Sequence, residues 1–300
     1  MAKDAVQGTL FQRPQSVSTL RVGPAGWNYR DWEGVVYPPG SSCDPLAYLA
    51  DYCDTIEINS SFYAPPRSKD TASWARRVAN NPRFRFTAKA WQRLTHERSA
   101  SEESSLIAEC DEVRASMAPL MEAERLGALL IQFPWKFRYT PENQDYLEKL
   151  FGHLSDFPVV VEVRHASWDV DSFYEFLRGH GVAFCNVDQP LIGKSIRPGE
   201  RVTAPLGYFR LHGRNYKTWF KEDVGRDARY DYLYTKPEIR RLAGKIRTVR
   251  ENAKESYAIT NNHFRGQAVV NALELLQELE GTPPAVPPLL EAAYPDRFPA

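Results

Sequence analysis

Eight short apolar segments alternate with amphipathic helical segments along most of the chain, and this order constrains the fold more than any other feature. The apolar segments have the length and residue content of strands, at residues 20–27, 55–62, 83–91, 126–134, 158–165, 182–188, 207–213 and 256–263. Strands that alternate with helices form parallel sheets. The order predicts an α/β fold, a single (β/α)8 TIM-type barrel, because an open sheet of eight strands would leave two unpaired edges. A doubly wound open sheet is the alternative.

The helices between these segments carry readable end signals. Thr140 is a suitable N-cap for a helix that starts at Pro141, and we expect Gly152 to follow the end of this helix. The last helix has an apolar face, with Gly281 just beyond it, formed by Val269, Leu273, Leu276 and Leu279. Three prolines in residues 189–206 disfavour a helix there. We therefore expect the barrel to lack one regular helix between its sixth and seventh strands.

Composition sets the domain organisation and excludes several classes of protein. With 43% hydrophobic residues, the chain can bury a large core, and we expect a flexible N-terminal tail at 1–18, the barrel at 19–281 and a proline-rich C-terminal tail at 282–300. There are 38 basic and 38 acidic residues, so net charge does not indicate direct binding to nucleic acid. Neither a signal peptide nor a membrane span is evident, and the four cysteines are scattered, which predicts a cytoplasmic protein with reduced thiols.

Polar and aromatic side chains gather where the predicted strands end. In chain order these are Trp27, Glu57, Asn59, Lys89, Trp91, Gln132, Glu162, Arg164, Asp188, Arg210, His212, Asn261, Asn262 and His263. Four pairs of them are two residues apart, as Glu162 and Arg164 are, so both members point to the same face of a strand. The single residue between the two members of each pair is apolar. We expect the polar members to face inward over the C-terminal mouth of the barrel, where barrel enzymes have their active sites.

Several of these strand ends carry motifs of one known family. The motifs are Val22-Gly23-Pro24-Ala25-Gly26-Trp27, Ile56-Glu57-Ile58-Asn59-Ser60-Ser61-Phe62-Tyr63, Phe86-Thr87-Ala88-Lys89, Val161-Glu162-Val163-Arg164, Tyr208-Phe209-Arg210-Leu211-His212-Gly213 and Thr260-Asn261-Asn262-His263. In combination they resemble the DUF72 or YecE-like family over roughly residues 21–279. The resemblance implies a TIM-type barrel and, since the activity of the family is not established, no particular reaction.

The charges at the mouth predict an anion site and disfavour a metal site. Carboxylates at positions 57, 162 and 188 are matched by cations at 89, 164 and 210, whereas a divalent-metal site normally leaves its carboxylates unneutralised. The preferred hypothesis is an enzyme, a lyase, isomerase or hydrolase, that acts on a small phosphorylated or carboxylated substrate resembling a sugar or nucleoside. Its catalytic groups would be Glu57 or Glu162 as base and His212 or Lys89 as acid. The alternative is a salt-bridge network that only closes the barrel.

Arginines and aromatic residues complete the predicted site. Arg164 and Arg210 would hold the anionic group, because guanidinium groups bind phosphate and carboxylate bidentately. The remaining predicted substrate contacts are Trp27, Asn59, Tyr63, Trp91, Gln132, Asp188, Asn262 and His263. No glycine-rich dinucleotide fingerprint or P-loop is found, so the sequence predicts no cofactor.

A short N-terminal motif favours a function of a different class. Gln7, Leu10 and Phe11 form a Q-x-x-L-F pattern that resembles the peptide with which bacterial proteins dock on the replication sliding clamp. Such a peptide would indicate a DNA-associated or repair-linked protein or a nuclease. Packing of Leu10 and Phe11 on the barrel of the same chain is the other interpretation.

Overall fold

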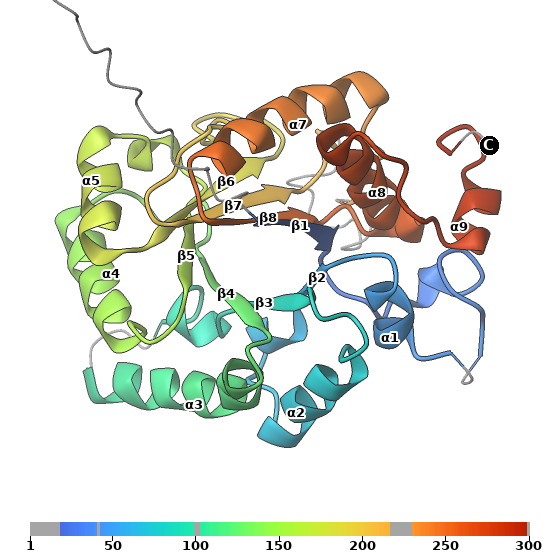
Figure 1. Cartoon of the computed structure of the whole chain (residues 1–300). Helices are drawn as coiled ribbons and strands as arrows, with labels where there is room; N and C mark the ends of the chain where they lie inside the picture. Colours follow the sequence, from blue (N-terminus) through green and yellow to red (C-terminus); the bar gives the residue numbers. More distant parts are fainter. Residues whose placement is uncertain (1–18, 41–42, 99–102, 217–229, 299–300) are drawn as a thin grey trace, which may run out of the picture.

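A computed structural model describes residues 19–40, 43–98, 103–216 and 230–298 of the 300-residue chain. Its eight strands are β1 (Thr19–Pro24), β2 (Thr55–Ile58), β3 (Arg85–Lys89), β4 (Leu126–Gln132), β5 (Val159–Glu162), β6 (Ala183–Asp188), β7 (Leu206–Leu211) and β8 (Glu255–Thr260). All neighbouring strands pair in parallel, in the order β1-β8-β7-β6-β5-β4-β3-β2. The strands form a ring with the helices around its outside (Figure 1). This is the predicted (β/α)8 barrel.

Strands β1 and β2 close the ring through a short contact instead of a long ladder. Ala25 and Glu57 form a single parallel bridge, and the amide of Gly26 donates to the carbonyl of Glu57 at 2.8 Å. Gly23 permits this approach, because a Cβ atom there would lie 1.8 Å from the carbonyl oxygen of Thr55. A glycine inside a strand commonly marks such a close approach of two backbones.

The helices that follow the strands are α1 (Pro45–Ala50), α2 (Ser68–Arg77), α3 (Glu103–Glu122), α4 (Pro141–His153), α5 (Asp171–His180), α7 (Lys236–Glu251) and α8 (Gln267–Glu280). The end signals of two of them are confirmed. Thr140 accepts a hydrogen bond from the amide of Asn143, and Gly281 ends α8 in the left-handed conformation. The prediction that Gly152 follows the end of α4 is wrong, because the helix continues to His153 and Leu154 is its C-cap. Residues 189–205 contain no helix, as the prolines predict.

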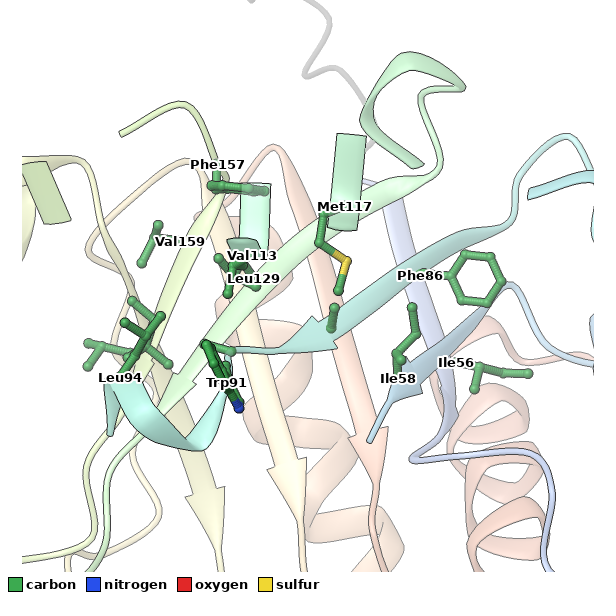
Figure 2. Close-up of a cluster of buried hydrophobic side chains, with 14 of the residues drawn as sticks. Ile56, Ile58, Phe86, Trp91, Leu94, Val113, Met117, Leu129, Phe157 and Val159 are labelled. Carbon is green, nitrogen blue, oxygen red and sulfur yellow. The ribbon is translucent and has the colours of Figure 1, made fainter. Parts of the chain in front are cut away.

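Outward strand side chains and inward helix side chains form the main core. Figure 2 shows Val113 and Met117 of α3 against the strand layer, which includes Phe86 of β3 and Leu129 of β4. These side chains are at most 2% exposed. Because burial of one such side chain contributes about 1.5–3 kcal/mol, this layer fixes which face of each strand points inward.

A second, smaller core fills the inside of the barrel. Small inward residues, Ala128, Ala183 and Cys185, leave space for the rings of Tyr208 and Tyr257. The barrel interior is therefore solid at its N-terminal end, and only its C-terminal mouth is available for a site.

The C-terminal residues pack against the barrel and include a short helix, α9 (Pro288–Ala293). Leu290 is fully buried, and Arg297 pairs with Glu274 of α8 at 2.6 Å. Within the described residues, no helix is long and apolar enough to cross a membrane. Gln7, Leu10 and Phe11 lie outside those residues, so the sliding-clamp hypothesis stays a prediction.

Candidate active site

A buried arginine holds two buried carboxylates together at the mouth of the barrel. Arg210, at an inward position of β7, donates from Nη2 to Oε1 of Glu57 at 2.6 Å and from Nη1 to Oε2 of Glu162 at 2.7 Å. All three side chains are at most 1% exposed. Charges so deeply buried persist only when they are paired and hydrogen-bonded. The arginine therefore joins β2, β5 and β7 through a single guanidinium group.

Glu162 has a second cationic partner. Arg164, two residues along the same chain segment, brings its Nε to 2.5 Å from Oε1 of Glu162, and its Nη1 donates to Gln189 at 2.6 Å. Burial opposes the ionisation of Glu162, but Arg164 and Arg210 outweigh it and hold the pKa of that carboxyl well below its usual range. Glu162 is therefore an ionised carboxylate that is paired with two arginines.

His212 lies within the same network. Its Nε2 is 3.0 Å from Nη2 of Arg164, and its Nδ1 is 2.9 Å from Nδ2 of Asn261. Burial lowers the pKa of His212 well below that of a free imidazole, and Arg164 and Arg210 lower it further. The ring is consequently neutral at physiological pH and does not supply a proton as an imidazolium would.

On the other side of Arg210, Glu57 contacts the layer below. The hydroxyl of Tyr208 lies 3.1 Å from Oε2 of Glu57 and 2.9 Å from the hydroxyl of Thr87. Both oxygens of Glu57 therefore have partners inside the barrel. The two carboxylates together form the floor of the mouth, below Arg210.

A cavity of about 830 Å³ lies over this floor. It is lined by Gly26, Trp27, Asn28, Tyr29, Pro45, Asn59, Ser60, Phe62, Tyr63, Trp74, Arg77, Lys89, His96, Gln132, Arg210, Tyr230, Asn261 and His263. Among the described residues of the lining, three carry a cationic side chain and none carries a carboxylate. Two of these cations are neutralised from outside the lining, Arg77 by Asp44 and Arg210 by Glu57 and Glu162.

Aromatic rings form much of the cavity wall. Trp27 meets Trp74 of α2 edge-on at 5.3 Å between ring centroids, and Tyr29 stacks on His263 at 4.5 Å. Tyr230 packs against the same histidine at 5.0 Å. Flat apolar faces beside hydrogen-bonding groups suit the binding of a sugar ring or another small ring.

Lys89 differs from the arginines because it faces the cavity without an acidic partner. It ends β3, its Nζ lies 4.0 Å from the centroid of the Phe62 ring, and no hydrogen bond or ion pair is formed by Nζ with any described residue. Burial, together with the charge of Arg210, lowers the pKa of Lys89 to about 7. At neutral pH this amine is therefore protonated in only about half of the molecules.

The match to known proteins covers nearly the whole barrel. The family model described as "Protein of unknown function DUF72" matches residues 21–294. The chain belongs to the DUF72 family. It is 28% identical over 272 residues to the UPF0759 protein YunF of Bacillus subtilis, which covers 87% of this chain and 95% of that protein.

Solved DUF72 structures have the same fold. A DUF72 family protein from Thermotoga maritima is 34% identical, with a TM-score of 0.76, and the match covers 87% of this chain and 99% of that one. One from Enterococcus faecalis is 30% identical, with a TM-score of 0.76, over 87% and 96% of the two chains. Membership of the DUF72 family supports the barrel fold but indicates no particular reaction. Only the side chains of the site indicate which chemistry is possible.

The structure separates the predicted site residues of this DUF72 barrel into four groups. Seven line the cavity, namely Trp27, Asn59, Tyr63, Lys89, Gln132, Arg210 and His263. Four lie in the buried network at its floor, namely Glu57, Glu162, Arg164 and His212. Trp91 is buried beside the cavity, where its Nε1 donates to the carbonyl of Tyr63 at 3.2 Å.

The remaining two predicted residues, Asp188 and Asn262, do not line the cavity. Asp188 is bound by Arg214 at 2.7 Å and by the hydroxyl of Tyr234 at 2.6 Å. Asn262 donates to Asn271 of α8 at 2.8 Å. Both side chains lie between the strands and the outer helices, because each is one residue away from an inward position of its strand.

Some cavity residues are absent from the predicted catalytic residues and substrate contacts. Asn261, the neighbour of Asn262, lines the cavity, and the alternation along β8 could have shown this, since Tyr257 and Ile259 point inward. Trp74 and Arg77 come from α2 and His96 from the loop after β3. No strand-end pattern marks these three, since they reach the mouth from outside the sheet.

Proposed function

We propose that this DUF72 protein is an enzyme that binds a small anionic, ring-containing substrate in the cavity and uses Lys89 as its acid–base group. The observation that carries the proposal is the lining of the cavity. Its described residues include cations and aromatic rings but no carboxylate. A phosphate or carboxylate group suits such an environment, because Lys89 has no acidic partner among the described residues and the rings provide apolar contact.

Lys89 takes the base role that the sequence suggested for Glu57 or Glu162. Both carboxylates are committed to arginines below the cavity, and neither lines it. An acid–base group works best when its pKa is close to the ambient pH, and the pKa of Lys89, about 7, meets that condition. The neutral amine accepts a proton from a bound substrate, while Arg210 stabilises the negative charge that develops.

The arrangement favours lyase or isomerase chemistry over glycoside hydrolysis. A glycosidase needs two carboxyl groups beside the sugar, one of them protonated. Here both candidates lie in the floor, and the pKa of Glu162 is held well below its usual range by Arg164 and Arg210 despite burial. Proton transfer at a carbon next to a carbonyl or carboxylate requires only one base and one cation, which Lys89 and Arg210 provide.

Calorimetry with matched ligands tests the binding part. We expect phenyl phosphate and benzoate to bind, benzyl alcohol not to bind, and K89M to weaken anion binding at least about tenfold. R67M is the matched control, because Arg67 is exposed and pairs with Asp70 away from the cavity. Equal affinity for the charged and uncharged compounds would refute an anion site.

Proton NMR in D2O tests the catalytic part. Small phosphorylated and carboxylated carbonyl compounds that bind are incubated with the protein, and exchange of their α protons for deuterium is followed. We expect exchange with the wild type and with R67M but not with K89M. Equal exchange rates in wild type and K89M would remove Lys89 from the mechanism.

A further inference from the structure

Lys89 combines features that suit a nucleophile as well as a base. A lysine that takes part in an ion pair presents its ammonium protons to an oxygen, and its nitrogen has no lone pair available. The Nζ of Lys89 instead lies against the face of Phe62, with no acceptor among the described residues, and it borders the cavity. Lysine amines desolvated in this way and placed beside another cation are activated for attack on carbonyl carbon.

Charges of both signs among the described residues act on Lys89. Arg210 and Arg164 disfavour its ammonium form, Glu57 and Glu162 favour it, and the neighbouring His96 ring is itself neutral at pH 7 because burial, with a smaller effect from Lys89, lowers its pKa to about 4. The two carboxylates are each bound by an arginine. Their attraction for the lysine is thereby offset, so that burial decides the balance.

We propose that Lys89 forms a covalent imine with a substrate that carries an aldehyde or ketone group as well as an anionic group. The amine lone pair attacks the carbonyl carbon, the C–N bond forms, the carbonyl π bond breaks, and one nitrogen proton moves to the carbonyl oxygen. The resulting carbinolamine then loses its hydroxyl group and the second nitrogen proton together as one water molecule, which gives the neutral imine. No oxidant, reductant or metal is needed for this step.

Arg210 and Arg77 would position such a substrate. Both line the cavity with Lys89, and both are fixed by carboxylates, Arg210 by Glu57 and Glu162 and Arg77 by Asp44. An anionic group bound between these cations would leave the carbonyl near the amine, with Trp27 or Tyr29 against the ring. This inference rests on the proposed function for the binding of the substrate, but it replaces proton acceptance by bond formation at Lys89.

Reductive trapping tests the inference on the intact wild-type chain. The probe is pyridoxal 5′-phosphate, an aldehyde with a ring and a phosphate, and borohydride converts any imine into a stable amine that peptide mass spectrometry locates. At pH 7 with substoichiometric probe, we expect Lys89 to be labelled at least about tenfold more than the exposed Lys149, since only about one in a thousand ordinary lysines is neutral there. Equal labelling of the two lysines would overturn the inference.

The pH dependence of labelling gives an independent readout. Labelling of Lys89 should reach half its maximum near pH 7, because its neutral fraction follows its pKa. Labelling of Lys149 should continue to rise towards pH 10. A half-maximum for Lys89 above pH 9 would also overturn the inference.

Two further outcomes separate the inference from the proposed function. Deuterium exchange catalysed by Lys89 without any trapping of its carbonyl substrates would overturn the imine and leave the acid–base enzyme standing. Selective labelling of Lys89 that neither saturates with probe nor is slowed by inorganic phosphate would support the imine and refute the anion site. The variant K89R, which keeps a positive charge but forms no imine, should show no labelling at position 89.

Discussion

Two charged networks at the ends of the strands have similar composition but lie on opposite faces of the sheet. The inner network, Arg210 with Glu57 and Glu162, lies inside the barrel at the floor of the cavity. The outer network, Arg214 with Asp188 and Glu238, lies between β6 and α7. The inner arginine is 1% exposed, whereas the side chain of the outer one is 25% exposed.

The difference between the networks shows that the inward or outward position of a charged residue at a strand end decides whether it reaches the cavity or binds the outer helices. Inward residues of β7 reach the cavity, as Arg210 does, whereas Asp188 of β6 is one position out of step and binds the segment that leads into α7. The outer network also includes the N-terminal cap of α7, since Glu238 accepts from Thr235. We therefore propose that the inner network serves the site and that the outer one contributes to stability.

Removal of the inner arginine should have the largest effect. R210M leaves Glu57 and Glu162 buried without their shared cation, and such a loss costs about 3–5 kcal/mol of unfolding free energy. Urea denaturation followed by circular dichroism measures it. The double variant R210M/E57Q should recover part of the loss, because one of the unpaired charges is gone. A cost below about 1 kcal/mol for R210M would mean that the inner network is not buried as described.

The pKa of Lys89 makes the stability of the inner region depend on pH. The pKa of Lys89 is about 7 in the folded chain, which is lower than its value in the unfolded chain. Between pH 7 and about 10 the unfolded chain therefore binds more protons than the folded chain. The contribution of Lys89 to the free energy of unfolding rises with pH over this range, by at most about 1.4 kcal/mol per pH unit. Below pH 7 both states are protonated, and the cost of the buried ammonium is fully present. We expect the stability difference between wild type and K89M to change between pH 7 and 9 in favour of the wild type. A constant difference over this range would contradict the lowered pKa.

The sequence predicted the fold better than the site, for physical reasons. Strand and helix order determines the barrel, and the apolar neighbours of Glu57, Arg164 and Arg210 indicate correctly which way these side chains point. The same alternation along β6 places Asp188 outside, because Cys185 and Val187 point inward, so the predicted contact of Asp188 with the substrate is wrong. The alternation of apolar and polar residues shows which face of a strand a side chain is on, but not how deep in the barrel it lies. The sequence therefore could not show that Glu162 lies below Arg210, or that Lys89 lies beside the cavity.

Disruption of the outer network should cost less stability and leave the cavity unaffected. R214M removes one partner of buried Asp188, but the hydroxyl of Tyr234 still donates to that carboxylate, so we expect a loss of about 2 kcal/mol. Phenyl phosphate should bind R214M as it binds the wild type. If R214M lowered anion affinity as strongly as K89M, the division between a site network and a structural network would be wrong.

The smallest and sharpest test of this division uses two neighbouring asparagines. Asn261 lines the cavity and contacts His212, whereas Asn262 bonds to Asn271 of α8 and to the carbonyl of Tyr232. N262A should lower the unfolding free energy by about 1–2 kcal/mol, because it removes two buried hydrogen bonds, and should leave anion affinity unchanged. N261A should weaken anion binding several-fold at a stability cost of about 1 kcal/mol or less, because its side chain has one bond to the network. Calorimetry and urea denaturation on both variants measure the two effects. A reversed result, with N262A losing affinity and N261A losing only stability, would show that the inner face of β8 has been assigned to the wrong residues.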